Sequence, residues 1–116
     1  MGQEDIIQIQ VIQWCEFNKG KYPMLSDLHH SPNGGKRNAR EAAKFKKMGT
    51  RAGFPDLELL YPNGKYHGLF IELKAPGGKV SQKQKEWIDK LNKRGYYAKV
   101  CVGFDEAIET IKSYLG

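Results

Sequence analysis

The segment GFPDLELLYPNGKYHGLFIELKA, residues 53–75, contains two short apolar runs, and three of its charged side chains, Asp56, Glu72 and Lys74, could do chemistry together. Asp56 follows a proline, and Glu72 and Lys74 stand two positions apart near the end of the segment. Strands that enter a core normally lack charge, because an isolated buried ion costs far more free energy than an exposed one. Two carboxylates beside an ammonium group are instead a set that can bind a divalent cation and activate water.

The pattern of this segment predicts a hairpin that brings the three side chains to one face. If the turn is symmetric about Gly64, Asp56 lies opposite Glu72. Side chains alternate between the two faces of a strand, so the even-numbered Asp56, Glu72 and Lys74 emerge together. The odd positions then form an apolar face. A β-bulge would shift this register by one residue.

Two carboxylates held this close repel each other unless a cation lies between them. Mg²⁺ favours one or two carboxylates together with water and the phosphate oxygens of a substrate. The set therefore predicts metal-assisted hydrolysis of a phosphodiester, in which Lys74 orients the attacking water or offsets charge in the transition state. The structural alternative is that Glu72 and Lys74 lie on a solvated strand face and Asp56 is a turn residue.

The positive charge of the chain is concentrated in one segment. The whole chain has a net charge of +6, and residues 29–54 carry the same excess, with Glu41 as their one acidic residue. Such a field indicates a polyanionic partner, most often nucleic acid, although a solvated lysine-rich helix face is the alternative. The basic residues of this segment are Lys36, Arg37, Arg40, Lys44, Lys46, Lys47 and Arg51.

The elements that must position these groups alternate between helical and strand patterns. At 116 residues the chain is expected to form one domain, 1–116, an α/β sandwich with a mixed sheet. Helices are predicted over residues 4–18, 38–48 and 81–94 and from Asp105 onward, and strands over 24–30, 57–61, 68–74 and 96–103.

Local signals define these elements further. The first segment also contains a strand-like alternation, but its length favours a helix, on which Glu4 shares the apolar face with Val11 and Cys15. Ser81 and Gln84 fit a capping box, and Asp105 is predicted as the N-cap of the last helix. The second helix is expected to bury a narrow stripe of Ala42, Ala43 and Met48.

Several classes of protein are not indicated. No run approaches the ~20 apolar residues that a membrane span requires, and the N-terminus lacks a signal pattern, so a cytoplasmic protein is expected. Cys15 and Cys101 have neither zinc nor redox spacing and are predicted to be small core residues.

The motif GFPD, a gap of fifteen residues and then ELK resembles the PD-(D/E)xK nuclease superfamily. The finer resemblance is to its virus-type replication-repair nuclease (VRR-NUC) branch, through SPNGGKR, KKMGTRAGFPDL, YHGLFIELKA and SQKQKEW. It covers nearly the entire chain. This resemblance implies a restriction-endonuclease-like core, in which helices flank a central mixed β-sheet.

The resemblance also implies roles for particular residues. Lys74 would be the catalytic lysine, and Gln84 would reach toward the site with Trp87 packed beneath it. Gln84 could instead serve only the capping box, and Glu4 could be an N-terminal glutamate favoured by the helix dipole. The implied metal ligands are the carboxylates of Glu4, Asp56 and Glu72 and the main-chain carbonyl of Leu73.

The implied substrate is DNA. Glycines in the SPNGGKR loop permit close approach of the backbone, and its cations meet phosphates. Stand-alone members of this branch resemble homodimeric, Mg²⁺-dependent nucleases that resolve Holliday junctions in DNA repair, with Mn²⁺ expected to substitute. A non-cutting or partner-dependent binding module and a sequence-specific restriction-like endonuclease are the alternatives. The predicted DNA-binding residues are Asn33, Gly34, Gly35, Lys36, Arg37, Arg40, Lys44, Lys47 and Arg51.

Overall fold

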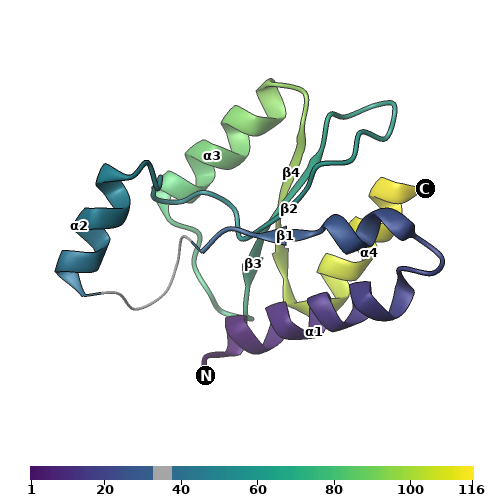
Figure 1. Ribbon diagram of the computed structural model, residues 1–116, viewed down its shortest axis with the longest axis horizontal. Helices are drawn as coiled ribbons and strands as arrows, with labels where there is room; N and C mark the ends of the chain where they lie inside the picture. Colours follow the sequence, from purple (N-terminus) through teal and green to yellow (C-terminus); the bar gives the residue numbers. More distant parts are fainter. Residues whose placement is uncertain (33–37) are drawn as a thin grey trace.

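The computed structural model describes residues 1–32 and 38–116 of the chain (Figure 1). The predicted loop that contains Asn33, Gly34, Gly35, Lys36 and Arg37 therefore lies outside the described residues. The elements follow the order α1 (Gln3–Asn18), the 3₁₀ helix η1 (Pro23–Asp27), β1 (His29–His30), α2 (Ala39–Lys47), β2 (Leu57–Leu59), β3 (Leu69–Lys74), α3 (Gln82–Lys93), β4 (Tyr97–Val102) and α4 (Gly103–Leu115).

The strands form one mixed sheet, as predicted, and their order in it is β1-β2-β3-β4. β2 pairs antiparallel with both β1 and β3, whereas β3 and β4 are parallel. Leu57 pairs with Ile71 and Leu59 with Leu69, which confirms the predicted register about Gly64. No bulge interrupts these pairs, so the alternation of faces holds through the hairpin.

Both faces of the central strand β3 are covered. Its odd-numbered residues, including Leu69 and Leu73, join the larger core cluster with residues of α1 and α4. Phe70 on the opposite face joins Leu91 of α3 and Ala98 in a second cluster. Figure 1 shows the matching layers, with α1 and α4 on one side of the sheet and α3 on the other. The charged residues of β3 are therefore buried.

Side chains cap the N-termini of α2 and α3 but not those of α1 and α4. Ser81 and Gln84 form the predicted capping box of α3, in which each side chain bonds to the other residue's backbone N–H. The prediction that Asp105 caps the last helix is wrong. Val102 is the N-cap of α4, and the Glu106 carboxylate accepts the N–H of Val102 across 3.0 Å.

Two further expectations are corrected. The strand predicted over residues 24–30 is reduced to His29–His30, because Pro23 starts a 3₁₀ turn that continues to Asp27. The helix predicted over 38–48 is present as α2, but it buries no residue. Its expected apolar stripe is exposed, and Met48 retains 70% of its accessible surface. α2 stands away from the sheet (Figure 1).

Both cysteines are free and buried, as expected of small core residues. Burial raises the pKa of the Cys15 thiol to about 11, so this side chain stays protonated and unreactive near neutral pH. Among the residues that the structure describes, every helix is too short or too polar to cross a lipid bilayer.

Candidate active site

Asp56 is held by its backbone to the end of β1 and by its side chain to β3. It directly precedes β2, and its Oδ2 accepts the backbone N–H of Leu73 across 2.8 Å. The Asp56 carbonyl oxygen accepts the N–H of Ser31 across 2.9 Å, and His30 Nδ1 lies 3.0 Å from the same oxygen. These contacts fix the carboxylate next to the end of β3, which the sequence pattern placed opposite Glu72.

Glu72 is the most unusual acid of this site, because only 2% of its surface is exposed. Its Oε2 accepts a hydrogen bond from Gln84 Nε2 across 3.1 Å and lies 3.4 Å from Lys74 Nζ. The pKa of the Glu72 carboxyl is raised to about 8, first by burial and then by the neighbouring Asp56 carboxylate, while Lys74 acts in the opposite direction. Without another cation, Glu72 therefore keeps its proton to a higher pH than an exposed glutamate does.

Lys74 enters the site from β3 and is itself 6% exposed. An ammonium group this deeply buried requires a partner, and Glu72 supplies it. The surroundings confirm that Asp56, Glu72 and Lys74 are one cluster within a packed sheet. The alternative of a solvated strand face is wrong for Glu72 and Lys74.

Glu4 approaches this cluster from the first turn of α1. A Cβ built on Gly78 would lie 3.3 Å from Glu4 Oε2 and 3.5 Å from Cδ of Lys74, so both side chains border the same small space. Within residues 1–32 and 38–116, however, no three side chains of His, Cys, Asp or Glu lie close enough to hold a metal ion together. The structure thus brings Glu4 beside Lys74 but does not join it to the Asp56–Glu72 pair.

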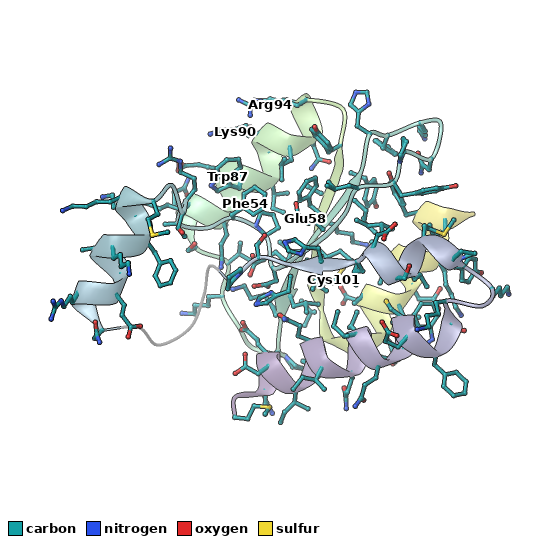
Figure 2. The ribbon with its side chains drawn as sticks, in the orientation of Figure 1. Phe54, Glu58, Trp87, Lys90, Arg94 and Cys101 are labelled. Atoms are coloured by element: carbon teal, nitrogen blue, oxygen red, sulfur yellow. The ribbon has the colours of Figure 1, made fainter. Side chains whose placement is uncertain are left out.

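Gln84 has both of the functions that the sequence left open. Its Oε1 accepts the backbone N–H of Ser81 across 2.9 Å, which caps α3, while its Nε2 reaches Glu72. One turn later, Trp87 packs edge to face on Phe54, with 5.0 Å between the ring centroids. Figure 2 shows these two aromatic residues together where α3 meets the segment before β2. Gln84 and Trp87 therefore connect the start of α3 to both β3 and the GFPD segment.

Gly53 makes this junction possible, and the sequence interpretation did not assign it a role. Its φ of +83° lies in the left-handed region, and a Cβ there would lie 2.7 Å from the carbonyl carbon of Lys83 and 2.8 Å from the backbone N of Gln84. The sequence signal that could have indicated this role is the glycine directly before Phe54-Pro55-Asp56. Glycine lets the backbone that leads to Asp56 touch the first turn of α3.

The predicted DNA-binding residues fall into two groups. Those of the SPNGGKR loop lie outside the described residues. The others are exposed and belong to α2 or to the segment that follows it: Arg40, Lys44, Lys47 and Arg51.

Comparison with known proteins agrees with this geometry. The profile of the VRR-NUC domain family matches residues 3–105. A solved structure described as a VRR_NUC domain protein superimposes with a TM-score of 0.83 at 39% sequence identity, covering 99% of this chain and 89% of that one. The fold is therefore restriction-endonuclease-like, with a mixed sheet between helices.

Curated relatives carry the similarity within much longer chains. A Fanconi-associated nuclease 1 homolog of Caenorhabditis briggsae is 42% identical over 88 residues, which are 76% of this chain and 10% of that protein. Fanconi-associated nuclease 1 of Ailuropoda melanoleuca is 37% identical over 62 residues, 53% of this chain and 6% of that protein. This chain thus spans a tenth or less of the length of these relatives.

Proposed function

This chain belongs to the VRR-NUC domain family and is by that membership a nuclease domain, and from this premise we propose that it is a Mg²⁺-dependent, structure-selective DNA endonuclease. The observation that carries the proposal is the buried cluster in which Asp56 and Lys74 flank Glu72. Each of two adjacent carboxylates raises the free-energy cost of ionising the other, and a divalent cation between them would offset that cost. Their hard oxygen atoms are the ligands that Mg²⁺ prefers, with Mn²⁺ as the expected substitute.

The residues of the cluster have distinct proposed roles. Asp56 and Glu72 would hold the ion together with the main-chain carbonyl of Leu73, and Glu4 would complete its shell by moving toward the pair from its place beside Lys74. The chemistry that a bound ion would supply is polarisation of the phosphoryl oxygen and a lower pKa of the attacking water. Lys74 orients this water and offsets the negative charge that develops on the phosphate. The Gln84 amide holds Glu72 in place for these steps.

Several features support DNA as the substrate. The exposed cations on and after α2 supply contacts to phosphates, which position a nucleic acid without reading its sequence. A domain of this size offers no separate base-reading module, so selection by shape is favoured. We infer a branched substrate, such as a Holliday junction, cut by a homodimer whose two sites are related by two-fold symmetry.

The test is cleavage of an end-labelled four-way junction, with linear duplex and single-strand controls, in Mg²⁺, Mn²⁺ and EDTA. Paired nicks close to the branch that require the metal are the expected result. Equal cutting of branched and linear DNA would keep the nuclease and overturn the junction assignment. Cuts at one fixed duplex sequence would indicate a restriction-like enzyme. Tight binding without cutting in either metal would mean that the domain binds DNA without hydrolysing it.

A further inference from the structure

A groove separate from the carboxylate cluster lies between α2 and α3. Its cavity of about 580 Å³ falls within the roughly 300–1,000 Å³ typical of ligand sites. None of Asp56, Glu72 and Lys74 lines it. We call it the α2–α3 groove, and the residues that matter for its chemistry are Phe45, Lys46, Arg51, Lys83, Trp87 and Lys90.

The charge of the α2–α3 groove favours an anion. Four cations line it, and Glu86 is the one acidic residue among the lining side chains. All four cations are exposed. Within the part of the chain that the structure describes, none of them makes an ion pair with a carboxylate. A ligand with more than one negative charge would satisfy Lys46, Arg51, Lys83 and Lys90.

An aromatic ring lies among these cations. Trp87 is half-buried, and Phe54 packs against it edge to face. Lys90 Nζ lies 4.5 Å from the centroid of the Trp87 ring. Figure 2 shows Trp87 and Lys90 projecting from α3 on the side where α2 lies. Because the long side chain of Lys90 is exposed and flexible, its ammonium group can move from the Trp87 ring to a phosphate. The face of the indole then becomes accessible to a planar ligand.

Phosphate-binding cations beside an aromatic surface are the combination that holds single-stranded nucleic acid, since each unpaired base offers a face for stacking. Paired bases lie stacked on one another, so a recessed indole can contact only a base that has left the stack. The cavity has the size of a small-ligand site, too small to hold a duplex. The groove therefore favours an unpaired segment over a duplex.

The α2–α3 groove lies beside the carboxylate cluster. Lys83 directly precedes Gln84, whose amide bonds to Glu72. The close approach of Gly53 to Lys83 places the segment that carries Arg51 against the first turn of α3. A strand bound along the groove would thus pass from α2 toward the proposed scissile position.

We propose that the α2–α3 groove binds an unpaired segment of the DNA substrate, with one base against Trp87 and the phosphates on the surrounding cations. This inference deepens the proposed function, on which it rests for the choice of DNA. It adds to the proposed branched substrate the requirement that at least one nucleotide next to the branch is unpaired when the DNA is bound. A recessed cationic surface could also attract an acidic protein segment, and the test below includes that outcome.

The test measures binding in EDTA, where no metal-dependent cleavage occurs. The chain has two tryptophans, so Trp14→Phe leaves Trp87 as the single reporter. Saturable quenching of its fluorescence by an oligothymidylate of about ten nucleotides is expected. Duplex of equal length should bind without comparable quenching. Absence of quenching despite binding, or equal quenching by duplex, would overturn the proposal, and stronger quenching by polyglutamate would assign the groove to a protein partner.

Matched variants locate the binding on α3. Lys90→Gln should weaken oligothymidylate binding and lower the slope of log affinity against log salt by about 0.7. Lys85→Gln removes the same charge from an exposed position of α3 outside the groove. It should change the affinity for oligothymidylate and the salt dependence of that affinity much less than Lys90→Gln does. Equal effects of the two variants would overturn the assignment. Trp87→Leu should weaken binding by about tenfold or more, with a thermal melt as the folding control.

These outcomes separate the two proposals. Quenching by oligothymidylate without any cleavage in Mg²⁺ would support the groove and overturn the nuclease function. Metal-dependent cleavage without quenching would support the nuclease and overturn the groove.

Discussion

The side-chain amide of Gln84 donates to Glu72 Oε2 across 3.1 Å while its oxygen caps the start of α3. One side chain therefore couples the position of a helix terminus to the orientation of a buried carboxylate. Lys74 Nζ approaches the same oxygen of Glu72 from β3. The geometry of the site thus depends on the docking of α3 as well as on the hairpin.

Substitutions at the cap can separate the two functions of Gln84. Ser81→Ala removes the acceptor for the Gln84 backbone N–H and should cost about 0.5–2 kcal/mol of stability, with Mg²⁺ affinity nearly unchanged. Gln84→Ala also removes the contact with Glu72 and should weaken Mg²⁺ binding by about tenfold. For both variants, isothermal titration calorimetry measures the Mg²⁺ affinity and urea unfolding measures the free energy of unfolding. Equal losses of Mg²⁺ affinity would show that Gln84 acts through the helix cap alone.

Lys74→Ala tests catalysis apart from binding. The proposed role in the transition state predicts a loss of cleavage rate of about 100-fold or more, while DNA affinity measured in EDTA changes little. Lys112→Ala is the matched control, because it removes an exposed lysine from α4 on the other side of the sheet. Retained cleavage in Lys74→Ala, or a parallel loss of affinity and rate, would exclude the catalytic role.

Two glycines with similar backbone angles allow a test of the α3 junction. Gly53 and Gly64 have φ values of +83° and +89°, but a Cβ on Gly64 would meet no atom within 4 Å. Gly64→Ala should cost about 1–2 kcal/mol from left-handed backbone strain. Gly53→Ala should cost about 1–3 kcal/mol more, because its Cβ would overlap the backbone of Lys83 and Gln84. Equal losses in urea unfolding would contradict this packing argument.

The raised pKa of Glu72 predicts how stability depends on pH in EDTA. The native state keeps the proton up to about pH 8, whereas the unfolded chain releases it near the ordinary value of 4.5. The free energy of unfolding should therefore fall as pH rises between these values, by about 1.4 kcal/mol per unit at most. Urea unfolding across this range should show this decline for the wild-type protein in EDTA and a flatter profile for Glu72→Gln. Addition of Mg²⁺ should restore the free energy of unfolding of the wild-type protein. An equal decline in Glu72→Gln would assign the effect to other groups.

Local patterns in the sequence were sufficient to predict the hairpin and the cluster. Strand alternation has a period of two, so a turn centred on Gly64 placed Asp56 opposite Glu72 and put Lys74 on the same face. The capping box of α3 was likewise visible, because Ser81 and Gln84 stand at the spacing that one helical turn requires. These features depend on residues close in sequence, and for them spacing is nearly equivalent to geometry.

Contacts between distant segments were decided by the tertiary structure alone. The burial of Glu72 and Lys74 follows from α3 covering the second face of β3, which no pattern within β3 indicates. The contact of Gly53 with Lys83 and the groove between α2 and α3 also depend on how separate elements pack. Packing depends on the shapes of side chains that the whole fold brings together, so the local periodicity of the sequence does not predict it.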